Sequence, residues 1–137
     1  MNSWMRLGVL AAVVGALHAA PAVAQTKPAA PQAKPAAPAA VTPAAIAAGD
    51  SIFHKTGNCY ACHSATATGT VGLGPNLTDA EWIHGDGSFD MIVATVTTGI
   101  AKEVSKSGVV MPAKGGSTIT DDQVKQVAAY IYSLSHK

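Results

Sequence analysis

Hydrophobic side chains from residue 42 onward recur every three or four residues in three segments, which is the spacing of one face of an α-helix. Three segments show this spacing, at 42–57, 88–99 and 120–137. Their core-facing positions are, in order, Ile46, Gly49, Ile52 and Phe53, then Phe89, Ile92, Val93 and Val96, and finally Val124, Val127, Ala128, Ile131 and Leu134. No stretch after residue 44 alternates apolar and polar residues for long, so the pattern predicts an all-α domain with three main helices.

The ends of the predicted helices carry residues that favour helix termini. Thr42, Ser88 and Thr120 stand where an N-cap is expected, and Gly57 and Gly99 follow the first two helices as terminators. The last helix also opens with the capping-box sequence T-x-x-Q and two aspartates, which suit the positive end of a helix dipole. These residues predict the helix boundaries independently of the apolar pattern.

Two long segments between the helices, 64–80 and 99–119, are rich in Gly, Pro and Thr. Loops of this length are uncommon in a compact domain unless they are functional. The core that could hold them is small, because aromatic residues make up 5% of the chain and alanine contributes much of its 48% hydrophobic content. A domain of this size often needs a metal, a disulfide or a cofactor. We therefore expect the loops to wrap around a cofactor.

The first 43 residues do not resemble folded protein. Residues 1–24 combine a basic start, an apolar run at 7–17 and small residues before Gln25, which is the layout of a secretory signal peptide cleaved after Ala24. The alternative is an uncleaved membrane anchor, although the apolar run is shorter than the ~20 residues of a spanning helix. Residues 25–43 are rich in Ala and Pro and are predicted to be an extended, disordered linker.

This layout places the folded domain at 44–137 and predicts export, to the periplasm in a bacterium, with membrane tethering if the leader is kept. The whole chain has a formal net charge of +1. The predicted domain contains six lysines, no arginine and eight acidic residues, which gives it a net charge of −2. A slightly acidic domain without arginine argues against nucleic-acid binding, which needs a basic surface.

Both cysteines of the chain lie in the sequence Cys59-Tyr60-Ala61-Cys62-His63. A thiol–disulfide redox motif needs a strand-containing context, and the pattern predicts no strands. A structural zinc site needs four ligands, and the sequence has no second ligand cluster. C-x-x-C-H is also the attachment signature of c-type haem. The motif therefore favours one covalently bound haem c, with thioethers at Cys59 and Cys62 and with His63 as an axial ligand of the iron.

Of the four methionines in the chain, Met91 and Met111 lie in the predicted domain. Met91 falls within the second predicted helix beside hydrophobic neighbours, where packing is its expected role. Met111 precedes Pro112 in the second long loop, which can fold over the far face of the haem. We therefore predict that Met111 is the second axial ligand, with His84 or an open sixth position as the alternatives. A Met/His pair raises the reduction potential and closes both axial positions.

Two further residues are predicted to support the cofactor. The carbonyl of Pro75 can accept a hydrogen bond from the free ring N–H of His63, which would orient that ligand, with an ordinary turn as the alternative. The indole N–H of Trp82 can point toward a haem propionate, with simple packing as the alternative.

The domain resembles a class I cytochrome c. The matching residues are Gly49 and Phe53, the C-x-x-C-H at 59–63, Gly74-Pro75-Asn76-Leu77, Met111-Pro112, and Ala129-Tyr130. The resemblance implies the cytochrome c fold, in which the first and last helices cross at right angles where Gly49 permits close approach and Phe53 and Tyr130 pack. The stretch "PNLTDAEWIHGDGSFDMIVATVTTG…MPA" is similar to the haem domains in the dihaem membrane subunit of cbb-type haem–copper oxidases. This chain differs in its single C-x-x-C-H and in its longer segment "IAKEVSKSGVV".

These patterns predict an exported mono-haem electron carrier that has no small-molecule substrate and is not an enzyme. It would pass single electrons between a donor and an acceptor redox protein of a respiratory or photosynthetic chain. Lys102, Lys106 and Lys114 would form a positive docking collar for such partners, unless they are ordinary solvated lysines. The alternatives are a tethered haem subunit of a larger oxidase or dehydrogenase complex at the membrane, and a haem sensor or peroxidase with an open sixth site.

Overall fold

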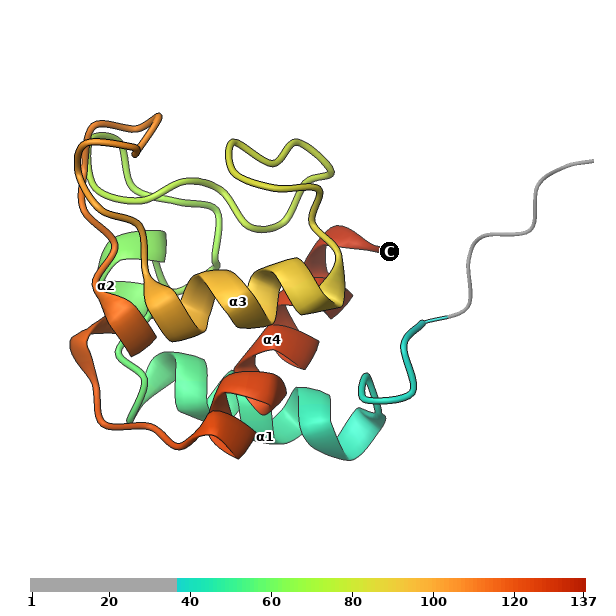
Figure 1. Ribbon diagram of the computed structural model, residues 1–137. Helices are drawn as coiled ribbons and strands as arrows, with labels where there is room; N and C mark the ends of the chain where they lie inside the picture. The colour runs from blue at the N-terminus through green and yellow to red at the C-terminus, as the bar shows by residue number, and fades with distance from the viewer. Residues whose placement is uncertain (1–36) are drawn as a thin grey trace, which may run out of the picture. The chain divides into compact units, whose positions relative to one another are not determined.

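The computed structural model describes residues 37–137, so the predicted leader at 1–24 and the linker residues up to 36 lie outside it. The helical elements are α1 (Pro43–His54), α2 (Tyr60–His63), α3 (Phe89–Thr98), the short 3-10 turn η1 (Ala113–Gly116) and α4 (Asp121–Ser135). Residues 37–137 contain no strand, only the isolated bridges Thr70–Gly74 and Ile100–Met111. The prediction of an all-α domain with three main helices is confirmed by α1, α3 and α4 (Figure 1).

The three long helices begin at their predicted N-caps. The hydroxyl groups of Thr42, Ser88 and Thr120 each accept a hydrogen bond from the backbone N–H three residues further on. The side chain of Gln123 completes the capping box of α4 by accepting from the backbone N–H of Thr120 at 2.9 Å. These bonds satisfy backbone donors that no intrahelical carbonyl can reach.

The first helix differs slightly from the predicted limits. Residues 38–43, which composition placed in the linker, form a turn and the first helical residue, and Val41 packs against the core. At the other end α1 stops at His54, three residues before Gly57. The backbone N–H of Gly57 donates to the carbonyl of Ile52 at 2.8 Å and closes the helix terminus.

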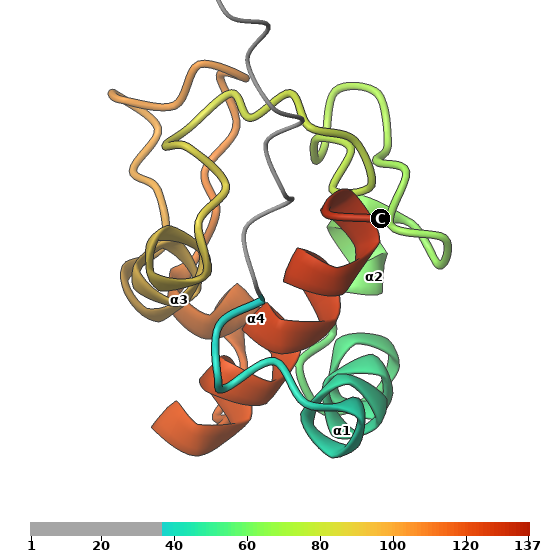
Figure 2. The same ribbon diagram turned by 90° about the vertical axis from the view of Figure 1, so that its right-hand side faces the viewer.

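Helices α1 and α4 cross in close contact (Figures 1 and 2). A Cβ atom on Gly49 would overlap the carbonyl oxygen of Gln126 and would lie 2.8 Å from Cβ of Tyr130. The fully buried Phe53 packs edge-on against Tyr130 with ring centroids 5.5 Å apart. Glycine is therefore required at 49 because the backbone of α4 occupies the space that a side chain would take.

The core lies between α1, α3 and α4. Its buried residues are Ile52 and Phe53 from α1, Phe89, Ile92 and Val96 from α3, and Val124, Val127, Ala128, Ala129 and Ile131 from α4, joined by Ala67, Leu77 and Ile119 from the connections. Most of the backbone of the long loops lies on the side of α3 that faces away from α1 (Figures 1 and 2). None of the helices within 37–137 has both the length and the apolar character needed to cross a bilayer.

His54 ties the end of α1 to the chain that follows α2, a contact that the sequence did not predict. Its Nε2 lies 2.7 Å from the carbonyl oxygen of Ala65, and its Nδ1 lies 2.9 Å from the carbonyl and 3.0 Å from the carboxylate of Asp50. The rings of Tyr60 and Tyr130 lie beside it. Because both ring nitrogens face acceptors, the Ala65 carbonyl above all and then Asp50 raise the pKa of His54.

We expect Gly49→Ala to destabilise the folded protein by about 3 kcal/mol, because the new methyl group must separate α1 from α4. Denaturant unfolding of the holoprotein measures this cost. The control is Ala47→Ser on the exposed face of the same helix, which we expect to change the free energy of unfolding by less than about 0.5 kcal/mol. Equal stabilities of the two variants would contradict the close crossing.

We also expect a pH-dependent contribution to stability from His54. Since the pKa of His54 is raised in the folded state, its contribution is complete below its ordinary value of about 6.5 and is lost as the pH rises through the folded value. Unfolding free energies measured between about pH 5 and about pH 9, on both sides of the ordinary His pKa, should show this loss in the parent and not in His54→Gln. Asp50→Asn should retain part of it, because the Ala65 carbonyl remains. The same pH profile in the parent and in His54→Gln would contradict this assignment.

Candidate cofactor site

A largely apolar cavity lies between the helices and the long loops. Its empty space is about 1130 Å³ when the part open to solvent is counted. Its apolar lining consists of Leu73, Leu77, Trp82, Ile83, Met91, Ile92, Val96, Ile100, Val109, Val110, Met111 and Ile131. Side chains from α2, α3, α4 and both long loops thus enclose one space, as expected of loops that wrap around an apolar group.

All the predicted site residues line this cavity, namely Cys59, Cys62, His63, Pro75, Trp82 and Met111. The two residues weighed as alternative ligands, His84 and Met91, line it too. The elements that carry His63 and Met111 stand on opposite sides, with α2 on one side and α3 with the 99–111 loop on the other (Figure 2). The fold therefore brings His63 and Met111 to one cavity although they lie 48 positions apart in the sequence.

The short helix α2 presents both cysteines on one helical turn. The backbone N–H groups of Cys62 and His63 donate to the carbonyl of Cys59 at 3.2 and 3.0 Å, and both thiols are free. Burial raises the pKa of the Cys59 thiol to about 11, so this thiol is protonated at neutral pH. A redox C-x-x-C motif has the opposite property, a lowered thiol pKa. Among residues 37–137, no three His, Cys, Asp or Glu side chains gather as in a zinc site.

His63 is buried and its ring is oriented by the predicted partner. Nδ1 lies 2.9 Å from the carbonyl oxygen of Pro75, which can only accept, so Nδ1 carries the proton. The other ring nitrogen, Nε2, has no hydrogen-bond partner within 37–137. Burial lowers the pKa of His63, with the Pro75 carbonyl opposing this shift, and the imidazole is therefore neutral at neutral pH. A neutral ring with Nδ1 protonated leaves the lone pair of Nε2 available to a metal.

The segment that carries Met111 is held against the end of α3. Met111 and Ile100 exchange two backbone hydrogen bonds of 2.8 and 3.0 Å. Gly99 has a positive φ of 69°, and a Cβ atom there would overlap the carbonyl oxygen of Met111 and lie 2.7 Å from the backbone nitrogen of Ala113. Glycine at 99 thus lets the chain turn at the end of α3 and pass close to Met111.

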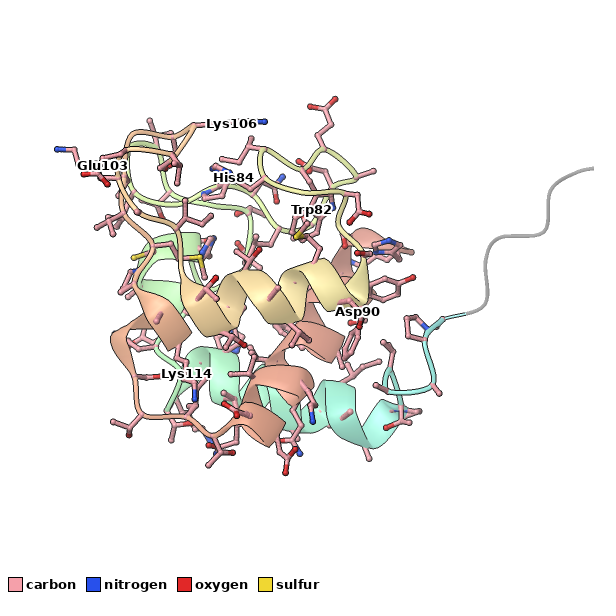
Figure 3. The ribbon with its side chains drawn as sticks, viewed as in Figure 1. Trp82, His84, Asp90, Glu103, Lys106 and Lys114 are labelled. Carbon is pink, nitrogen blue, oxygen red and sulfur yellow. The ribbon has the colours of Figure 1, made fainter. Side chains whose placement is uncertain are left out.

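Trp82 stands in the 78–88 loop on the side of α3 where the loops gather (Figure 3). Its indole ring packs against Gly87, where a Cβ atom would lie 2.6 Å from Cε2. Within the part of the chain that the structure describes, the indole N–H makes no hydrogen bond. Trp82 lines the cavity, and its contact with a haem propionate stays a prediction.

The predicted collar of three lysines does not form. Lys114 pairs with Asp121 at 2.8 Å, at the start of α4, and its side chain is 28% exposed. Figure 3 shows Lys114 far from Lys106 and Glu103, which lie in the 99–111 loop. The chain turns at η1 and carries Lys114 away from the loop that contains Lys102 and Lys106 (Figure 3).

His84 makes a contact that the sequence analysis missed. Its Nε2 accepts a hydrogen bond of 3.1 Å from the backbone N–H of Lys106, which joins the 78–88 loop to the 99–111 loop. The sequence gives no signal for it, because the donor is a backbone group and the residues are 22 positions apart.

The chain is similar to a known family and to several known proteins. Residues 44–131 match the family model described as cytochrome c oxidase, cbb3-type, subunit III. The chain is 41% identical over 93 residues to the cbb3-type cytochrome c oxidase subunit CcoP of Rubrivivax gelatinosus, covering 68% of this chain and 27% of that protein. It is 38% identical over 93 residues to subunit FixP of Sinorhizobium medicae, covering 66% and 30%.

The chain thus spans less than a third of the length of these two relatives. A solved structure with a similar fold is cytochrome CL from the methylotroph Methylophaga aminisulfidivorans, with a TM-score of 0.55 and 25% sequence identity. The match covers 70% of this chain and 57% of that one.

Proposed function

The chain belongs to the cytochrome c family described as cytochrome c oxidase, cbb3-type, subunit III, and we propose that it is an electron-transfer domain that carries one covalently bound haem c. The family membership confirms the resemblance seen in the sequence. The observation that carries the proposal is that both cysteines, His63 and Met111 line a single apolar cavity. The 137 residues contain two cysteines, which suffice for one haem attached by two thioethers.

The chemistry of the cavity fits this cofactor. Cys59 and Cys62 lie on one turn and would form the thioethers, while the apolar lining would enclose the porphyrin. His63, neutral and held by the Pro75 carbonyl, would offer Nε2 to the iron, and Met111 would offer its sulfur. Held by these two residues, a haem c would supply reversible one-electron chemistry at its iron.

The protein's own residues hold and shield this group. The Pro75 carbonyl keeps the ring of His63 in one tautomer and one orientation. The two hydrogen bonds to Ile100 hold the backbone of Met111, and the free indole N–H of Trp82 is the donor that we assign to a propionate. Filling both axial positions from the chain leaves no open site for a substrate, so we assign no catalytic residue.

The relatives favour an oxidase-associated role over the freely diffusing carrier that the sequence alone favoured. CcoP and FixP are named as subunits of cbb3-type cytochrome c oxidases, and this chain is similar to less than a third of each. We therefore propose that this domain works on the exported side of a bacterial membrane, where it takes electrons from a redox protein and delivers them to an oxidase complex.

Replacing Met111 with Ala should abolish the long-wavelength absorption band that methionine–iron ligation gives an oxidised cytochrome c. It should also let carbon monoxide bind readily to the reduced protein, because one axial position is opened. Optical spectra and CO titration of the purified holoprotein measure both effects. Met91→Ala is the matched control, since Met91 lines the same cavity from α3. Loss of the band in Met91→Ala instead would transfer the ligand role to Met91.

Electron delivery to an oxidase predicts rapid oxidation of the reduced protein by aerated membranes that contain a cbb3-type oxidase. Membranes from a matched strain without that oxidase should oxidise the protein at least about tenfold more slowly, because the proposed electron acceptor is missing. A tenfold difference in rate corresponds to about 1.4 kcal/mol of activation free energy. Stopped-flow absorption at the haem bands gives the two rates. Equal rates in the two membranes would favour the free carrier.

A further inference from the structure

The interior of the 99–111 loop is weakly held to the rest of the domain. Within residues 101–110 the backbone hydrogen bonds join near neighbours, from Val104 to Ala101, from Ser105 to Lys102 and from Gly108 to Ser105. The side-chain bond between Ser105 and Ser107 is also local. The loop's three charged side chains form no ion pair within 37–137, and Val104 is 69% exposed.

One hydrogen bond connects this loop interior to another part of the described structure. The backbone N–H of Lys106 donates to Nε2 of His84 at 3.1 Å. The base of the loop is closed separately by the paired backbone bonds between Ile100 and Met111. The loop therefore has two hydrogen-bonded attachments, one at its base and one at Lys106, and side chains such as Val109 line the cavity.

The chemistry of this bond is specific to a neutral imidazole. Because the Lys106 backbone group can only donate, Nε2 of His84 must be unprotonated and the ring proton must lie on Nδ1. The same lone pair cannot also bind iron, so His84 in this position is not an axial ligand. His84 lies among the cavity-lining residues of the 78–88 loop, and Figure 3 shows it together with Trp82 and Lys106 on the same side of α3.

We propose that His84 is a positioning residue. By accepting the hydrogen bond from Lys106 it holds residues 101–110 of the 99–111 loop in place and thereby keeps the adjoining Met111 on the iron. The proposal rests on the proposed function, in which Met111 is the axial ligand. A loop fastened only at its base samples many more conformations, and each one that moves the Met111 segment favours release of the sulfur. The bond from Lys106 to His84 lowers the population of these open conformations.

Two pairs of variants of the full-length holoprotein test this. His84→Leu removes the acceptor, whereas His84→Gln keeps an acceptor oxygen near the position of Nε2. Lys106→Pro removes the backbone donor, whereas Lys106→Ala removes only the side chain. The first readout is hydrogen exchange of the Lys106 amide in the His84 variants. The second is the rate at which carbon monoxide binds the reduced protein, which depends on how often Met111 leaves the iron.

In His84→Leu, we expect the Lys106 amide to exchange and carbon monoxide to bind about fivefold faster than in the parent, the size of effect that loss of one hydrogen bond produces. His84→Gln should stay within about twofold of the parent, because an acceptor is retained. Lys106→Pro should reproduce the faster CO binding, and Lys106→Ala should not. Lys106→Pro keeps the test valid if His84→Leu does not fold.

Parent-like exchange and CO binding in His84→Leu would overturn the proposal, and so would equal acceleration in His84→Leu and His84→Gln. The proposed function fails separately. If the parent lacks the methionine–iron absorption band, Met111 is not the ligand, and positioning of a ligand by His84 is overturned with it. If the parent has the band and the His84 variants behave like the parent, Met111 keeps its role and only the part assigned to His84 is lost.

Discussion

The close crossing of α1 and α4 at Gly49 is the constraint on which the rest of the domain depends. With no side chain at 49, the backbone of α4 at Gln126 rests directly on α1, and Phe53 and Tyr130 can meet beside the crossing. This compact contact lets a core made mostly of alanine, valine and isoleucine hold together. The crossing occupies only one side of α4, since Ile131 on the same helix lines the cavity. The packed pair α1 and α4 thus supports both the core and one wall of the cavity.

The site itself is built by backbone geometry more than by side-chain packing. The carbonyl of Pro75 sets the ring of His63, the paired bonds of Ile100 hold Met111, and a backbone N–H approaches His84. Glycines at 74 and 99 let these segments come close, since a Cβ on Gly74 would lie 2.7 Å from the carbonyl oxygen of Cys62. The loops supply mostly aliphatic side chains to the lining, such as Leu73, Ile100 and Val110, which explains how a chain poor in aromatics encloses this cavity.

Local and periodic features of the sequence predicted most of the fold. The apolar spacing and the caps at Thr42, Ser88 and Thr120 gave the three helices, because these features act over one or two helical turns. The C-x-x-C-H motif and the resemblance to cytochromes c pointed to the residues that line the cavity. Contacts that depend on loop paths were not predictable, since His54 meets a carbonyl at Ala65 and Lys114 turns toward Asp121 without any periodic signal. The single C-x-x-C-H favoured a free carrier, whereas the relative CcoP is named as an oxidase subunit.

The hydrogen bond from His63 to the carbonyl of Pro75 has a consequence for how this site tolerates sequence change. Every amino acid has a backbone carbonyl, so the acceptor survives any replacement at position 75 that preserves the path of the chain. What the proline ring adds is a restricted φ, which limits the conformations of the loop before and after the cofactor is attached. Variation at 75 is therefore constrained by the shape of the loop and not by the chemistry of the side chain, whereas at His63 the chemistry of the side chain is itself the constraint.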